Sequence, residues 1–264
     1  MTMTIVRASH PSHPLRDCAT MLRRQLRHLQ RYPSMTLMLV GMPVIFLLLF
    51  VYVLGGTLGA GLGGDRGDYA SYVTPGILLM TVGTAVSGTS VSVAMDMTEG
   101  IVARFRTMAI FRPSVLTGHV LGSMAQTLLS VVVVAGVAVL VGFRPTAGVG
   151  GWLAALAMIA VFAFALIWLG VALGVSTRSV ETASNTPMPL MLLPFLGSGF
   201  VPTDSMPAAL RWFAEYQPFT PMIETVRGLL MGTPVGGHAV AALVWSAAIG
   251  AGSYAWAIRR YNRT

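Results

Sequence analysis

Residues 152–175 read WLAALAMIAVFAFALIWLGVALGV, a stretch without one charged side chain. A helix needs about 20 consecutive apolar residues to cross the hydrocarbon core of a bilayer. This stretch is long enough to cross as a helix and too apolar for the surface of a soluble protein. It therefore predicts a membrane-spanning helix and indicates that the whole chain is a membrane protein.

Five further stretches of the same character predict six spans in all. The other five cover about 35–54, 75–95, 115–141, 183–201 and 238–258. The composition agrees, because 55% of the 264 residues are hydrophobic and only 10% are charged. We expect an all-α polytopic membrane protein in which residues 1–264 form a single transmembrane domain.

None of the six stretches holds Asp, Glu, Lys or Arg near its middle. A carrier driven by an ion gradient needs ionisable groups at that depth to bind the driving ion. An inverted internal repeat, the other mark of such carriers, is not evident either. An ion-coupled secondary transporter is therefore the less favoured alternative, and energy for any transport must enter from outside the membrane.

The chain has no lysine, and most of its 17 arginines lie on the same predicted side of the membrane as the two termini. This distribution predicts cytoplasmic termini. Without lysine the chain cannot form the phosphate-binding loop of an ATPase, so we expect no bound cofactor and no metal. The net charge of +8 flanks apolar spans rather than covering a polar fold, which argues against nucleic-acid binding.

Residues 15–32 repeat apolar side chains every three or four positions, as one face of a helix does. The remaining surface of that helix carries Arg23, Arg24, Arg27 and Arg31. A basic amphipathic helix before a span is expected to lie flat at the cytoplasmic interface. It either anchors the topology or docks a cytoplasmic partner.

The cytoplasmic loop 96–113 has the charges of a short capped helix. Asp96 or Thr98 is suited to cap it, Glu99 falls in its first turn, and Arg104 and Arg106 fall near its end. Such a helix could transmit the movement of a partner protein to the membrane spans. The spacing is equally compatible with a solvated loop.

The segment 202–236 is too apolar for a solvated loop, and its prolines divide it into helices at about 207–216 and 220–231. Both are too short to span, so we expect them at the outer interface or re-entering shallowly. Glu224 and Arg227 are spaced to pair on one helix face, which suits stabilisation better than substrate contact.

Prolines 187, 189 and 194 make the fifth span either a plain kinked helix or an unwound segment. Gly197-Ser198-Gly199 together with His238 suggests a rhomboid-type protease, but the spacing is wrong for one. His119 and His238 fall near span ends, where interfacial or packing roles are expected.

Two motifs carry a resemblance to a known family. One is the outer series 199–207 (GFVPTDSMP), 213–218 (FAEYQP) and 227–232 (RGLLMG), and the other is the loop 96–106 with Gly100 and Arg104-Phe105-Arg106. Together they resemble the permease subunits of type-2 ABC exporters, in particular the daunorubicin-resistance (DrrB-like) permeases. Ala109 departs from that pattern, which commonly has a proline there.

The resemblance implies a permease dimer, expected to be a homodimer, in the plasma membrane of a bacterium. Two copies of a separate ABC ATPase would bind ATP and Mg²⁺, and a hydrophobic drug, antibiotic or lipid would move outward. Lipid-linked polysaccharide or another glycoconjugate is the alternative cargo. The residues expected to couple the ATPase are Asp96, Glu99, Gly100, Arg104, Phe105 and Arg106. The residues expected to form the outer gate are Pro202, Pro207, Pro218, Glu224 and Arg227.

Overall fold

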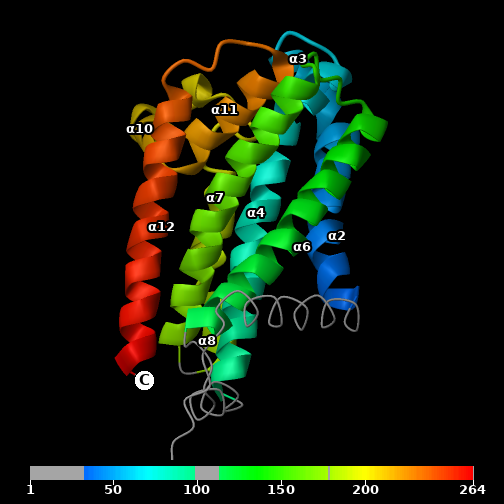
Figure 1. Ribbon diagram of the computed structural model, residues 1–264. Coiled ribbons are helices and arrows are strands. Elements are labelled where there is room, and N and C mark those ends of the chain that lie inside the picture. The colour runs from blue at the N-terminus through cyan, green and yellow to red at the C-terminus, as the bar shows by residue number, and fades with distance from the viewer. Residues whose placement is uncertain (1–32, 99–112, 178, 264) are drawn as a thin grey trace, which may run out of the picture.

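The structure is a computed structural model, which describes residues 33–98, 113–177 and 179–263. These ranges form helices and turns without a strand (Figure 1). The elements are α2 (Pro33–Leu48), η1 (Leu49–Leu54, a π-helix), α3 (Gly55–Gly61), α4 (Arg66–Thr98), α6 (Pro113–Val141), α7 (Val149–Ser176), α8 (Val180–Asn185), α9 (Met188–Leu192), η2 (Thr203–Ser205), α10 (Ala208–Tyr216), α11 (Phe219–Met231) and α12 (His238–Arg263).

Five helices in the described ranges are long and apolar enough to cross a membrane. They are Leu39–Gly61 (α2, η1 and α3 together), Arg66–Thr98, Leu116–Val141, Val149–Ser176 and His238–Tyr261. Each coincides with one of the predicted spans, so five of those six predictions are confirmed.

Helix α4 begins at Arg66, well before the predicted start of its span. Asp65 caps it, since its carboxylate accepts hydrogen bonds from the backbone N–H of Gly67 (2.7 Å) and Asp68 (3.0 Å). The carboxylate of Asp68 in turn accepts from the N–H of Asp65 at 3.0 Å. This reciprocal cap starts the helix in a polar stretch, which a count of apolar residues cannot detect.

The prediction of a continuous span at 183–201 is wrong. The chain forms only α8 and α9 there, followed by turns at 193–200. Pro187 and Pro194 lack the N–H that an interior helix position needs, and their rings clash with the preceding turn. The proline cluster therefore unwinds this segment, as one of the two sequence-based readings proposed.

The interrupted segment 180–201 runs antiparallel along α4. At one end Ser87 donates to the carbonyl of Ser184 (3.3 Å), and at the other Tyr69 donates to the carbonyl of Phe200 (3.2 Å). Eighteen residues of α4 separate these contacts, which is about 27 Å along a helix. The segment thus extends over a length close to the thickness of a bilayer's hydrocarbon core, in two short helices and a run of turns.

Helices α4 and α7 form the middle of the bundle, with α2 and α6 on one side and α12 on the other (Figure 1). Glycines allow this close packing. A Cβ on Gly170 would lie 2.8 Å from the carbonyl oxygen of Val86, and one on Gly174 would lie 2.6 Å from that of Ser90. The two backbones approach each other closely at these glycines.

Helices α10 and α11 lie at the same end of the bundle as α3 (Figure 1). Their bounds agree closely with the two short helices expected at 207–216 and 220–231. The start of α2 and the end of α12 both lie at the opposite end. The expected interfacial helix at 15–32 and most of the loop 96–113 fall outside the described residues.

Candidate functional site

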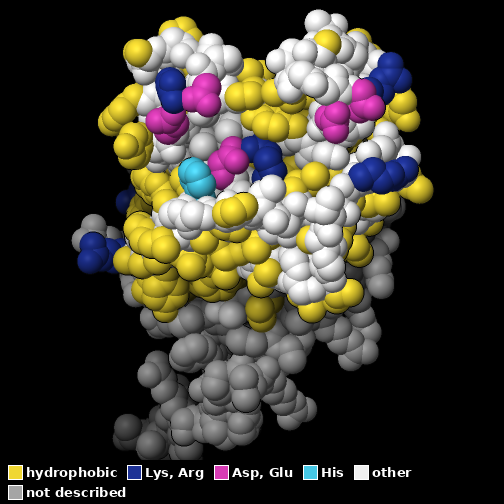
Figure 2. Space-filling model, turned by 90° about the horizontal axis from the view of Figure 1, so that it is seen from above, with side chains coloured by type: hydrophobic (Ala, Val, Ile, Leu, Met, Phe, Trp, Pro, Cys, Tyr) yellow, Lys and Arg dark blue, Asp and Glu magenta, His cyan; other side chains and the backbone are white. Residues whose placement is uncertain are grey.

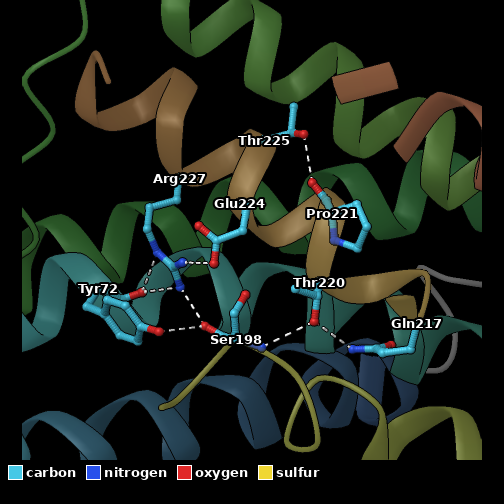
Figure 3. A network of polar contacts seen from close by, with 8 residues as sticks. All are labelled: Tyr72, Ser198, Gln217, Thr220, Pro221, Glu224, Thr225 and Arg227. Carbon is cyan, nitrogen blue, oxygen red and sulfur yellow. Dashed lines mark hydrogen bonds and ion pairs between the residues drawn. The ribbon is translucent and has the colours of Figure 1, made fainter. Parts of the chain in front are cut away.

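The turns 193–200 lie against α11 and the first turns of α4, where side chains take over the hydrogen bonding that a helix would supply (Figure 3). The hydroxyl of Tyr72 donates to the carbonyl oxygen of Ser198 at 3.0 Å. Tyr69, one turn earlier on α4, donates to the carbonyl of Phe200. Unwound backbone inside a membrane protein requires such partners.

Arg227 of α11 is the centre of this network. Its Nη2 donates to the carbonyl oxygens of Ser198 (2.7 Å) and Tyr72 (3.2 Å), and its Nη1 pairs with the carboxylate of Glu224. The guanidinium also lies over the ring of Tyr72, 4.0 Å from the centroid. The ion pair predicted from the spacing of Glu224 and Arg227 is thus confirmed. Only 13% of the Arg227 side chain is exposed, so the pair is largely buried.

Gln217 and Thr220 continue the network on the other side of the turns (Figure 3). The amide nitrogen of Gln217 donates to the carbonyl of Leu193 (3.2 Å) and to the hydroxyl oxygen of Thr220 (3.0 Å). That hydroxyl oxygen accepts from the backbone N–H of Ser198 at 3.3 Å. The connection before α11 and the first turn of α11 thereby hold the unwound segment at both ends.

The turns also touch α4 directly through two glycines. A Cβ built on Gly76 would lie 2.5 Å from the carbonyl oxygen of Gly199, well inside contact distance. No side chain fits at Gly76 without moving the backbone of the turns. The unwound segment is therefore positioned by shape as well as by hydrogen bonds.

An aromatic cluster joins the same turns to the first span. The rings of Phe195 and Phe200 stack with centroids 4.4 Å apart, and Phe50 of η1 lies 4.5 Å from Phe200. Phe46 of α2 meets Phe195 edge-on at 5.6 Å. The π-helix η1 thus presents an aromatic side chain to the unwound segment, and π-helical turns are frequent at functional sites.

A cavity of about 650 Å³ opens beside this network. Its walls come from α4 (Asp68, Tyr72), the connection between α6 and α7 (Arg144) and α11 (Arg227, Met231). The volume falls within the range of small-molecule sites. The lining combines both signs of charge with apolar surface, so this end of the bundle can accommodate part of an amphipathic molecule.

The view onto this end shows acidic and basic side chains in small clusters (Figure 2). One cluster is Arg211 of α10 with Asp204 and Glu215. The hydrogen bond to Glu215 and the charge of Asp204 raise the pKa of Arg211 above its ordinary value. All three side chains are exposed, so this cluster differs from the buried pair at Arg227.

At the opposite end, the structure places one of the predicted coupling residues. Asp96 lies inside α4 rather than at the start of a new helix, and its carboxylate meets the ring Nε2 of His119 at 3.0 Å. The hydroxyl of Thr98 donates to the carbonyls of Ala94 and Met95 in its own helix, at 3.0 Å each. The other predicted coupling and interfacial residues lie outside the described residues: Glu99, Gly100, Arg104, Phe105, Arg106, Arg23, Arg24, Arg27 and Arg31.

The three prolines of the predicted outer gate each precede a short element. Pro202 comes before η2, Pro207 before α10 and Pro218 before α11. Proline is favoured at such starts because its missing N–H has no helical partner there. They direct the path of the chain around Glu224 and Arg227.

Sequence reasoning missed Tyr72, Gln217, Thr220 and the carbonyl of Ser198. The proline and glycine cluster does indicate irregular backbone, whose carbonyls must find donors. The partners are 126 residues apart for Tyr72 and Ser198, so no local spacing identifies them. Ser198, considered above as a nucleophile, is buried and contributes its backbone to the network.

Comparison with known proteins agrees with this architecture. The ABC-2 type transporter family matches residues 16–231. The chain is 29% identical to a daunorubicin resistance ABC transporter permease protein of Streptomyces coeruleorubidus over 216 residues, which cover 81% of this chain and 75% of the relative. It is 27% identical to a probable doxorubicin resistance ABC transporter permease protein of Mycobacterium tuberculosis over 212 residues, which cover 79% and 74%.

The matched region includes the first span, the loop after α4, the unwound segment and the short helices α10 and α11. The family match therefore covers both the loop 99–112 and the Arg227 network, along with the helices that connect them. The chain belongs to the ABC-2 type transporter family.

Proposed function

We propose that the chain is the permease subunit of an ATP-driven exporter that moves a hydrophobic drug, antibiotic or lipid outward across a bacterial plasma membrane. The observation that carries this proposal is the family match over residues 16–231. The similarity to two relatives named as drug-resistance permeases supports it. ATP and Mg²⁺ are bound and used by a separate ATPase subunit.

The division of labour follows from the sequence and the family. The chain has no lysine for a phosphate-binding loop, and its spans have no charged residue near their middle. An ATPase docked at the loop 96–113 and the helix 15–32 would supply the energy. Asp96, Glu99, Gly100, Arg104, Phe105 and Arg106 are the residues proposed to receive it.

The bundle offers surfaces for lipid and for a second copy of the chain. Large apolar side chains are exposed along α2 (Leu37, Ile45), α6 (Leu129, Leu140) and α12 (Val240). A monomeric soluble protein rarely exposes continuous apolar surface of this kind. We propose a homodimer with a path for the cargo between the two copies.

The orientation is proposed from arginines and aromatic residues. Arg259 and Arg260 end α12, and the exposed Trp212 and Tyr216 of α10 lie at the other end of the bundle. Arginine favours the cytoplasmic side, and Trp and Tyr favour the headgroup level. These features support the proposal that both termini are cytoplasmic and that α10 lies at the outer interface.

The test is ATP turnover by the chain purified together with its ATPase and reconstituted in liposomes. We expect a hydrophobic cargo such as daunorubicin to stimulate turnover, and we expect Glu99→Ala and Arg104→Ala to reduce that stimulation about fivefold or more. Glu181→Ala, an exposed acidic residue of α8, is the control and should behave as the unmodified chain. Unchanged stimulation and transport in Glu99→Ala and Arg104→Ala would show that the coupling assignment is wrong.

A further inference from the structure

The spans hold a buried ionisable pair that their apolar composition conceals. His119 of α6 and Asp96 of α4 meet at 3.0 Å, with 6% of the His119 side chain and 13% of the Asp96 side chain exposed. Their neighbours Val93, Leu116 and Val120 belong to the hydrophobic core. A polar pair in such surroundings is costly unless its members satisfy each other, so intramembrane ionisable residues usually have a role beyond packing.

The pair belongs to a short ladder of polar contacts between α4 and α6. Ser92 of α4 approaches the Nδ1 of His119 at 3.5 Å, at the limit of a hydrogen bond. One turn further into the bundle, the hydroxyl of Thr89 donates to that of Ser123 at 2.9 Å. The two helices are therefore tied at successive turns on facing sides.

The place of this ladder in the fold gives it a consequence. Asp96 lies two residues before the end of α4 and His119 lies six residues after the start of α6. The loop proposed to receive the push of the ATPase, 99–112, joins these two helix ends. A contact between the two helices at this point determines whether α4 and α6 move together or separately when the loop moves.

Helix α4 also reaches the other functional region. Tyr72, which holds the unwound segment and stacks with Arg227, lies 24 residues before Asp96, or about 36 Å along the helix. A change in the position of α4 at its inner end is thus applied directly to the outer network. One continuous helix connects the two sites.

We propose that His119 and Asp96 are positioning residues for coupling, whose buried pair ties α4 to α6 so that a push on the loop moves both helices as one unit. The inference rests on the proposed function, because coupling has meaning only if an ATPase drives the permease. It assigns a role to His119, for which the sequence indicated an interfacial or packing role.

The test compares four variants of the chain in its complex with the ATPase: His119→Ala, Asp96→Ala, the double alanine variant, and the exchange Asp96→His with His119→Asp. The measured quantity is the ratio of cargo-stimulated to basal ATP turnover. Each single variant should lower the ratio about fivefold or more, since it removes the contact between Asp96 and His119 that joins the two helices. The double variant should be no worse than the worse single one, and the exchange should recover at least about half of the ratio.

Thr127→Ala is the matched control. Thr127 is also a fully buried polar residue of α6, but its hydroxyl bonds to the carbonyl of Ser123 in its own helix. It should leave the ratio unchanged. Single variants that behave like Thr127→Ala, single losses that multiply in the double variant, or an exchange no better than the single variants would each overturn the proposal.

Amide hydrogen exchange of the complete chain separates this inference from the proposed function. The amide hydrogens of residues 92–98 and 116–123 should exchange about tenfold faster in the single variants than in Thr127→Ala. The variant that carries both Asp96→His and His119→Asp should restore the slower rate. Equal exchange in all variants would overturn the tie itself. A wild-type complex without cargo stimulation would overturn the proposed function and the coupling role with it, while the exchange data still report on the tie.

Discussion

Arg227 shows how one residue can organise the end of the bundle where α10 and α11 lie. Its guanidinium serves two carbonyls on different elements, a carboxylate and an aromatic face. A planar fork with five donors can do this, whereas an ammonium group cannot match the same geometry. The i, i+3 pairing with Glu224 could be predicted from the sequence because it is local. The contacts with Tyr72 and Ser198 could not, because they depend on the path of the chain.

Replacing this arginine gives a direct test at the residue scale. We expect Arg227→Lys to lower the free energy of unfolding by about 2–4 kcal/mol, because several buried charge-assisted hydrogen bonds are lost. Equilibrium unfolding in mixed detergent micelles measures it. Arg211→Lys is the control, since the Arg211 ion pairs are exposed, and it should cause no measurable change. Equal losses in the two variants would contradict the role given to burial at Arg227.

At the element scale, apolar length predicted the five continuous helices well, because each must satisfy its own backbone within the membrane. It failed for 183–201, where apolar composition is kept but Pro187 and Pro194 prevent a regular helix. Composition reports that a segment belongs in the membrane interior. Whether its backbone is helical depends on partners such as Tyr72 and Gln217, which local patterns do not reveal.

The close approach between α4 and the unwound segment can be tested with two glycines of the same helix. Gly76→Ala should destabilise the chain by about 1–3 kcal/mol, because the new Cβ would lie against the backbone of Gly199. Gly88→Ala is the control, since nothing lies within 4 Å of its Cβ position, and it should be neutral or slightly stabilising. Equilibrium unfolding compares the two. A neutral Gly76→Ala variant would show that the segment does not press on α4 as described.

At the scale of the whole molecule, the chain combines an apolar bundle with polar contacts at its two ends. One end holds the Arg227 network and a cavity, and the other end holds the Asp96–His119 pair. The expectation of spans without charge near the middle fits this arrangement, since Asp96 lies near the end of α4. The central claim is that such a bundle moves a hydrophobic molecule with energy supplied by another polypeptide.

The measurement that tests this claim most directly is drug accumulation in inside-out membrane vesicles that contain the chain and its ATPase. We expect daunorubicin to accumulate in the vesicles when ATP is added, to continue accumulating when a protonophore abolishes the proton gradient, and to stop when the ATPase is left out. Accumulation that needs the proton gradient but not the ATPase would contradict the account and favour an ion-coupled carrier.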